Sequence, residues 1–304
     1  MESCTMNHVS VDDFRNYKSQ SQRQLIKPAS DFLDEAMAML DDGVHLTGDK
    51  LPWEKTHNLF RFRMGEVTIW SGINGNGKSL VMGQAALWLA KDTNVLIASM
   101  EMKGSMTIAR MLRQGYGGRK PTQDFRQKFE DVTDLRLWIY DQTDVVQSED
   151  IMSMIDWSAE QKGIKHIMID SLMMCGVDQE QGETQKRFVA ELCTKAKEFN
   201  IHIHLVTHAR KSPVGAKNYI PGKFDISGSA SITNLAFNVI LIHLNDEKRK
   251  AIENKSSYSY TDPDGLFIVD KQRNGEFTGK FGFWFHDESL QWIDNYNGVS
   301  MQWL

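Results

Sequence analysis

A glycine-rich octamer at residues 72–79 constrains this chain more than any other feature. It reads Gly-Ile-Asn-Gly-Asn-Gly-Lys-Ser, and it stands between an apolar run at 67–70 and an apolar helical pattern at 80–87. This spacing between a strand and a helix is that of a P-loop, whose glycines let successive backbone N–H groups point at phosphate. We therefore expect ATP, or another NTP or dNTP, as the ligand.

The polar residues of the octamer have separate expected roles. Lys78 is expected to reach the β- and γ-phosphate oxygens, and Ser79 to offer its hydroxyl to Mg²⁺. The other expected nucleotide-binding positions of the loop are Gly72, Asn74, Gly75, Asn76, Gly77 and Leu80. The alternative, an accidental match in a loop rich in glycine and asparagine, is weakened because strand, loop and helix all fall where the motif needs them.

Length and composition favour one α/β core with a short appendage. The chain has 304 residues, of which 41% are hydrophobic and 25% charged, enough for one large core. Its three cysteines have no paired or metal-type spacing, which fits a reducing cytoplasm. Because no apolar run approaches the ~20 residues of a membrane span, we expect a cytoplasmic protein without a membrane partner.

The first 50 residues differ from the rest and are expected to form a tail followed by a short helix. Residues 1–28 are polar and end at Pro28, and Ser30 is the expected N-cap of a helix over about 30–42. The apolar stripe of this helix consists of Phe32, Leu33, Ala36, Met37 and Leu40. The stripe either folds back on its own domain or docks on a neighbouring subunit.

From residue 51 to residue 304, strand and helix patterns alternate. Strands are expected at 66–70, 95–100, 135–141, 166–170, 202–207, 237–243, 265–270 and 280–285, and helices at 105–114, 151–162 and 187–199. The alternation predicts an α/β fold with a mostly parallel sheet and helices on both faces. Antiparallel hairpins are expected near the C-terminus, where helical patterns disappear.

Three strand ends carry polar residues suited to triphosphate chemistry. Glu101 follows a strand expected next to the P-loop strand or one removed from it, and is the candidate general base. Asp170 ends an apolar strand, as a carboxylate that organises Mg²⁺ does. His208 also ends a strand and can contact the γ-phosphate. The alternatives are a solvated acidic residue for Glu101 and structural roles for Asp170 and His208.

A basic loop follows His208. It holds Arg210, Lys211, Lys217 and Lys223 with no acid between them, and Ser227, Gly228 and Ser229 come next. The charges and the backbone N–H groups of the small residues suit a nucleic-acid phosphate backbone, although the net charge of −5 does not indicate one. The alternative is an ordinary exposed loop.

Lys271 and Arg273 stand two residues apart beside a glycine turn. If both charges meet the phosphate of an adjacent subunit, Arg273 is an arginine finger and hydrolysis requires assembly. The alternative is a basic hairpin on the surface.

Together these motifs resemble the hexameric replicative helicases with a RecA-type core, which include the DnaB type, the Twinkle type and the helicase half of phage primase-helicases. The matching segments are 72–79, 99–102, 167–171, 206–208, 227–229 and 271–275. Single elements such as the P-loop are shared by many ATPases, but Lys-Gln-Arg-Asn-Gly at 271–275 is much more specific to this group. The resemblance covers roughly residues 51–295.

The resemblance implies catalytic roles. Lys78 and Ser79 would bind phosphate and Mg²⁺, Glu101 would activate water, and Asp170 would organise Mg²⁺. His208 would sense the γ-phosphate, while Arg273 and Lys271 would complete the neighbour's site. The basic loop would line a central channel, and Phe285 would stack on the nucleotide base, although Phe281, Phe283 and Phe285 also fit a simple core.

The resemblance also implies an assembly. By family precedent the chain would form a homo-oligomeric, hexameric ring that moves 5′ to 3′ on single-stranded DNA at a replication fork, with helix 30–42 as the linker that docks on the next subunit. No primase domain fits in the first 50 residues, so primase, loader and polymerase would be separate proteins, as in a compact phage helicase. A RecA-like recombinase and a protein-directed ring ATPase are the alternatives.

Overall fold

The computed structural model describes residues 27–42, 47–177, 182–210, 219–226 and 230–302. The chain divides into two units, Met1–Val44 and His45–Leu304. In the first unit, a 3-10 turn, η1 (Ala29–Phe32), leads into the helix α2 (Leu33–Asp42). The predicted N-cap is wrong: Pro28 holds the cap position without a side-chain bond, and Ser30 lies inside the first turn. The apolar side chains Phe32, Leu33, Met37 and Leu40 are exposed.

A nine-stranded sheet forms the centre of the second unit, in the order β3-β2-β4-β5-β1-β6-β7-β8-β9. The strands are β1 (Val67–Ser71), β2 (Val95–Ser99), β3 (Leu137–Ile139), β4 (His166–Asp170), β5 (His202–Val206), β6 (Asn238–Leu244), β7 (Gly265–Gln272), β8 (Gly279–His286) and β9 (Gln291–Ile293). Pairing is parallel from β3 to β6 and antiparallel from β6 to β9. The predicted mostly parallel sheet with C-terminal hairpins is confirmed.

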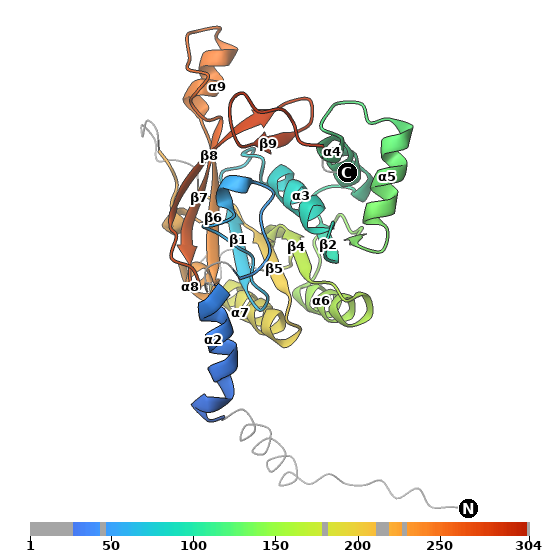
Figure 1. Ribbon diagram of the computed structural model, residues 1–304, viewed down its shortest axis with the longest axis vertical. Helices are drawn as coiled ribbons and strands as arrows, with labels where there is room; N and C mark the ends of the chain where they lie inside the picture. The colour runs from blue at the N-terminus through green and yellow to red at the C-terminus, as the bar shows by residue number, and fades with distance from the viewer. Residues whose placement is uncertain (1–26, 43–46, 178–181, 211–218, 227–229, 303–304) are drawn as a thin grey trace, which may run out of the picture. The chain divides into compact units, whose positions relative to one another are not determined.

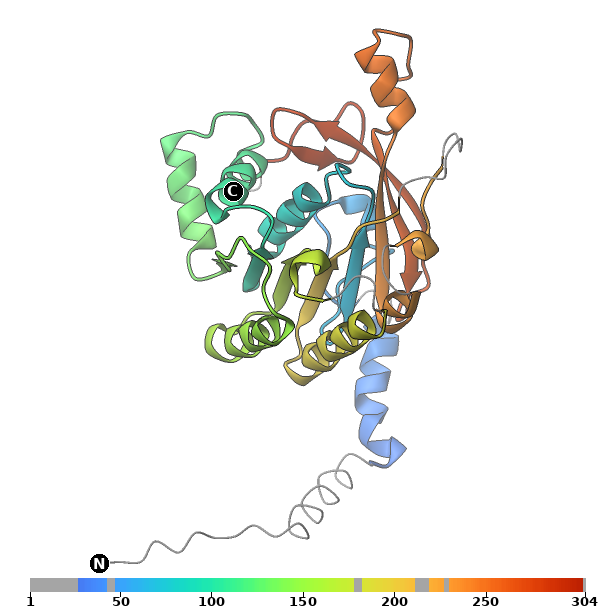
Figure 2. The same cartoon turned by 180° about the vertical axis from the view of Figure 1, so that it is seen from behind.

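Helices cover both faces of this sheet. They are α3 (Lys78–Leu89), α4 (Gly104–Tyr116), α5 (Gln123–Thr133), α6 (Ser148–Lys162), α7 (Gly182–Glu198), α8 (Ala230–Leu235) and α9 (Asp246–Glu253). Alternate residues of a strand point to opposite faces, so Trp70 of β1 packs in the core with α3, α4 and α5, while Ile69 packs in the core with α6, α7 and α8. Figure 1 and Figure 2 show α3, α4 and α5 grouped apart from α6 and α7.

One expectation about these elements is wrong. Because β4 and β5 both stand between β2 and β1, the strand before Glu101 is neither next to the P-loop strand nor one removed from it. Helix α9 joins β6 to β7, and the described residues from β7 to β9 then contain no further helix, as expected for the C-terminal hairpins. The short strand β9 (Gln291–Ile293) was not predicted, because a strand of this length has too few residues to show an alternating pattern. Within the described residues, no helix has the length and apolar content needed to cross a bilayer.

Three histidines of the parallel strands β4 and β5 have their side chains in the interior of the protein. His166, His202 and His204 are fully buried. Trp70 Nε1 can only donate, so His204 Nδ1 accepts its proton at 3.2 Å and His204 must be protonated on Nε2. That Nε2 donates to His166 Nδ1 at 3.1 Å, and His166 Nε2 donates to the Asp49 carboxylate at 3.0 Å. The relay fixes one tautomer for each of the two rings.

His202 is held separately in the neutral form. Its Nδ1 donates to the Arg63 carbonyl oxygen at 2.6 Å, which leaves Nε2 to accept from the Thr68 hydroxyl at 2.8 Å. Burial, the nearby His166 and Arg63 outweigh the backbone bond and lower the pKa of His202 to about 3. Burial also holds the pKa of His204 well below its ordinary value. Both rings therefore stay uncharged in the folded protein.

Acid should destabilise this fold through these rings. Between pH 7.5 and pH 5 the unfolded chain takes up a proton at His202 and the folded chain does not, so the free energy of unfolding should fall by about 2 kcal/mol from His202 alone. Urea unfolding at several pH values measures this fall. The variant His202→Gln should lose about that share of the pH dependence. An unchanged pH dependence in the variant would contradict the assignment.

Candidate functional site

The P-loop is hydrogen-bonded to β6 and to the segment that follows β5. The Asn76 side-chain amide donates to the Ile242 carbonyl of β6 at 3.0 Å, and the Ala209 backbone N–H donates to the Gly72 carbonyl at 3.0 Å. A Cβ on Gly72 would lie 2.4 Å from the Ile242 oxygen, so only glycine fits there. Gly77, with φ of 75°, turns the chain into α3 in the left-handed region.

Lys78 is the first residue of α3 and is buried. Its Nζ donates to the carbonyl oxygens of Gly72 at 2.9 Å and Ile73 at 3.2 Å, so the ammonium group lies across the loop. Burial lowers the pKa of Lys78, and the carboxylates of Asp170 and Glu101 oppose that shift. A cation held by two carbonyl oxygens in a low-dielectric site is well placed to bind phosphate oxygens.

A cavity of about 510 Å³ opens in front of this loop. It is lined by Asn74, Gly75, Gly77, Lys78, Ser79, Leu80, Glu101, Arg110, Asp170, Met173 and His208. The structure thus brings the predicted loop residues together with all three strand-end residues. Among the other predicted loop positions, Asn76 lines a neighbouring cavity. Gly72 contributes its carbonyl oxygen, which accepts from Ala209 and Lys78, and its lack of a side chain lets β6 approach closely.

Ser79 and Asp170 form a hydroxyl–carboxylate pair at the base of the cavity. β4 ends at Asp170, which is 6% exposed, and its carboxylate is hydrogen-bonded to the Ser79 side chain. Burial raises the pKa of Asp170, and this bond and Lys78 oppose the rise. A buried carboxylate beside a hydroxyl is an oxygen donor set of the kind that Mg²⁺ prefers. The residues present therefore fit Mg²⁺.

Glu101 faces this pair although β2 lies far from β1. Strand β2 pairs with β4 in the register that sets Ser99 opposite Asp170. The Ser171 hydroxyl donates to Glu101 Oε1 at 2.6 Å, and His208 Nε2 lies 3.7 Å from the same oxygen. The interaction with His208, the hydrogen bond from Ser171 and the nearby charge of Lys78 outweigh burial and lower the pKa of Glu101 to about 2. Glu101 is therefore ionised at neutral pH.

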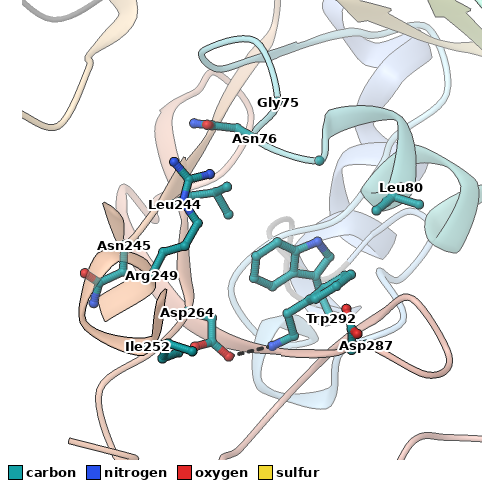
Figure 3. Close-up of a pocket in the computed structure, with 12 residues that line it drawn as sticks. Gly75, Asn76, Leu80, Leu244, Asn245, Arg249, Ile252, Asp264, Asp287 and Trp292 are labelled. Atoms are coloured by element: carbon teal, nitrogen blue, oxygen red, sulfur yellow. Dashed lines mark hydrogen bonds between the residues drawn. The ribbon is translucent and has the colours of Figure 1, made fainter. Parts of the chain in front are cut away.

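A second cavity, of about 550 Å³, adjoins the first. It is lined by Gly75, Asn76, Gly77, Leu80, Leu244, Asn245, Arg249, Ile252, Asp264, Phe285, Asp287 and Trp292 (Figure 3). Three of these residues, Gly75, Gly77 and Leu80, line both cavities. Of the three candidate aromatic residues, Phe281 and Phe283 are buried in the core and Phe285 faces this cavity.

Trp292 and Arg110 are among the lining residues that the sequence patterns did not predict. Trp292 packs against Phe285 with ring centroids 5.2 Å apart, and its backbone bonds to both ends of the Gln84 side-chain amide of α3. Arg110 reaches the first cavity from α4, which Arg113 ties to the carbonyls of Asp287 and Glu288. Arg110 lies nine residues after Glu101 on the helix that follows it, a spacing that could have suggested it.

Lys271 and Arg273 lie at the opposite end of the strands from the P-loop. Gln272 pairs with Asn238, which pairs with Thr68 near the start of β1, whereas the P-loop follows the end of β1. Lys271 Nζ donates to the carbonyls of Thr233, Asn234 and Ala236, and Arg273 donates to that of Asn234 at 2.8 Å. Burial, Arg273 and Lys223 lower the pKa of Lys271 to about 8.

Only part of the predicted DNA-binding loop is described. Arg210, two residues beyond His208, is exposed, and its backbone N–H donates to the Asp225 carbonyl at 2.7 Å. The Lys223 backbone N–H donates to the Asp270 carboxylate at 2.6 Å. The described start of the loop thus lies beside the first cavity, and its described end is hydrogen-bonded to β7. Lys211, Lys217, Ser227, Gly228 and Ser229 lie outside the described residues.

Comparisons with known proteins agree with this geometry. The family profile of the DnaB-like helicase C-terminal domain matches residues 57–294. A Twinkle homologue of Arabidopsis thaliana, chloroplastic and mitochondrial, is 27% identical over 243 residues, which are 72% of this chain and 33% of that protein. The chain thus spans about a third of the length of this curated relative.

Solved structures share the fold at low sequence identity. A DnaB-like replicative helicase, described with its interactions with primase, has a TM-score of 0.71 and 14% identity over 88% of this chain and 67% of its own. A second solved structure, described as an ATPase domain, has a TM-score of 0.70 and 15% identity over 86% of this chain and 98% of its own. The chain therefore belongs to the DnaB-like helicase C-terminal domain family, and it has the RecA-like α/β fold.

Proposed function

We propose that this chain is the motor of an ATP-dependent DNA helicase, a ring that moves 5′ to 3′ on single-stranded DNA and unwinds duplex at a replication fork. One observation carries the proposal. The C-terminal ends of the parallel strands bring together Lys78, Ser79, Asp170, Glu101 and His208. Lys271 and Arg273 lie at the opposite end of these strands. Such a site is completed by a second copy.

The first cavity would hold the triphosphate of ATP. Lys78 and the loop N–H groups would bind the β- and γ-phosphates, and Ser79 with Asp170 would hold Mg²⁺, which neutralises phosphate charge when bound. Arg110 adds a cation on the α4 side. Phe285 and Trp292 would flank the base in the second cavity, which shares Gly75 and Gly77 with the first.

Glu101 would accept the proton of the attacking water. A carboxylate with a pKa of about 2 is a weak base, and its strongest stabilising partner is His208. If His208 turns to the γ-phosphate, Glu101 loses that interaction and becomes more basic. The same movement would pull on the loop that begins at Arg210, which links hydrolysis to the DNA-binding segment.

The position of the two basic residues supports ring assembly. Arg273 and Lys271 of one subunit would neutralise the γ-phosphate bound to the P-loop of the next, as an arginine finger does. The exposed apolar stripe of η1 and α2, with Phe32 and Leu40 among its residues, would dock on a neighbouring subunit. We assign residues 1–50 to a tail with this linker and residues 51–304 to the motor domain, in a hexameric ring.

Single-stranded DNA would pass along the basic loops. Arg210, Lys211, Lys217 and Lys223, with Ser227, Gly228 and Ser229, would contact phosphates. Backbone contacts of this kind carry little base preference and weaken with salt, because binding releases counterions. Primase, loader and polymerase would be separate partners, and the cytoplasm is the compartment that suits this work.

Strand displacement tests the helicase proposal. With ATP and Mg²⁺, forks that carry a 5′ tail should be unwound, forks with a 3′ tail alone should not, and Arg273→Ala should abolish unwinding because the neighbour's γ-phosphate loses its cation. Labelled forks resolved on a gel give the readout. ATP hydrolysis without unwinding of any fork, together with strand pairing activity, would favour a recombinase instead.

Mixing two inactive variants tests completion of the site between subunits. Lys78→Ala keeps its basic residues and Arg273→Ala keeps its P-loop, so random mixing in a head-to-tail ring should leave about a quarter of the interfaces intact. ATPase activity should recover to about that fraction of wild type. A mixture of Lys78→Ala with Glu101→Gln serves as the matched control, because both changes damage the same half of the site. Equal inactivity of the two mixtures would contradict the shared site.

The pH dependence of hydrolysis tests the contact between His208 and Glu101. With a Glu101 pKa of about 2 in the free enzyme, the wild-type kcat/KM, which reports the ionisations of the free enzyme, should show no acid limb from this group above pH 5. In His208→Asn the largest lowering influence on Glu101 is gone, so its pKa should rise and the acid limb should move to higher pH. Glu101→Gln should reduce kcat by about 100-fold or more at every pH. Superimposable limbs for wild type and His208→Asn would refute the contact.

A further inference from the structure

Helix α9 is a feature that the proposed function leaves unexplained. It joins β6 to β7 and carries the sequence Asp-Glu-Lys-Arg-Lys-Ala-Ile-Glu. Figure 1 shows it standing clear of the other helices at one end of the sheet. Such a short, charged helix has little apolar surface with which to stabilise itself. A specific set of contacts must therefore hold it in place.

A buried lysine supplies these contacts. Lys248 is 8% exposed, and its Nζ binds the Asp264 carboxylate at 2.8 Å and the Asp262 carbonyl at 2.6 Å. The Asn245 side chain caps the helix by accepting from the Lys248 backbone N–H at 3.0 Å, and it donates to the Pro263 carbonyl at 3.1 Å. The base of α9 is thus bound firmly to the start of β7.

The same carboxylate connects α9 to the aromatic wall of the second cavity, which Phe285 and Trp292 form. While one oxygen of Asp264 binds Lys248, the other accepts from the Phe285 backbone N–H at 2.9 Å, a bond drawn in Figure 3. Asp264 therefore fixes α9 and Phe285 relative to each other. Because Lys248 neutralises Asp264, this carboxylate does not repel an anionic ligand.

Two side chains of α9 face the cavity from this anchored base. Arg249 and Ile252 both line it, opposite Leu80 and Trp292. In Figure 3 the Arg249 guanidinium points from α9 toward Asn76 of the P-loop. Arg249 is held by ion pairs to Asp246 at 3.0 Å and Glu253 at 3.9 Å within its own helix. Such exposed pairs are weak, so a ligand can replace them at small cost.

We propose that α9 is a cap over the nucleoside part of the bound nucleotide. With the phosphates on the P-loop, the base and ribose extend past Gly75, Gly77 and Leu80 into the second cavity. Ile252 covers the base from the side opposite the aromatic wall, and Arg249 donates hydrogen bonds to acceptor atoms of the ribose or base. This inference rests on the proposed binding of a nucleoside triphosphate, and it makes α9 a determinant of affinity for the nucleoside alone.

Comparing two ligands separates the cap from the phosphate site. In the full chain with Mg²⁺, Arg249→Ala and Ile252→Ser should each raise the Kd for ATP by about 10-fold, the loss expected for one hydrogen bond to a charged group or one apolar contact. The Kd for inorganic tripolyphosphate should stay within about twofold of wild type, because this ligand has no nucleoside. Lys250→Ala is the matched control, since Lys250 is exposed on the same helix and does not line the cavity.

Isothermal titration calorimetry gives both constants. Unchanged ATP affinity in Arg249→Ala and Ile252→Ser would overturn the cap, and so would an equal loss of affinity for ATP and tripolyphosphate. Retained tripolyphosphate binding in the variants also shows that they are folded. A wild-type chain that binds tripolyphosphate but not ATP would overturn the cap while leaving the phosphate site in place, whereas binding of neither ligand would remove the proposed function itself.

Discussion

Parallel pairing of β1 with β5 on one side and β6 on the other is the constraint on which the site depends. It brings the P-loop against β6 closely enough for Asn76 to bind the Ile242 carbonyl, and it carries the chain after β5 past Gly72. These contacts fix the loop before any ligand binds. A preorganised loop loses little entropy when it meets phosphate, so the sheet itself supplies part of the binding free energy.

The two ends of the sheet divide the chemistry between them. The carboxyl edge gathers the P-loop, Glu101, Asp170 and His208, and the amino edge of β6 holds Lys271 and Arg273 against the end of α8. A rigid sheet cannot bring the two ends of its strands together, so these groups cannot meet within one chain. The proposed function therefore links hydrolysis to assembly, while the proposed cap on α9 and the rings of Phe285 and Trp292 would recognise the nucleoside from within one subunit.

Sequence reasoning succeeded where the signal is local. The P-loop and the eight expected strands follow from apolar runs and glycine positions within a few residues, and the α/β class follows from their alternation. It failed where contacts join distant segments. The order of β2, β4 and β5 depends on long-range pairing, and Trp292 reaches the site through Gln84, which is 208 residues away in the chain. Arg110 and α9 escaped because a helical charge pattern does not reveal which cavity it faces.

The dependence of ATPase activity on protein concentration tests the central claim most directly. If the catalytic site is shared between copies, activity per chain should be close to zero for monomers. It should rise steeply over the concentration range in which light scattering detects assembly, and then reach a plateau. Constant activity per chain, from dilute monomers to assembled protein, would show that one chain holds a complete site and would contradict the account.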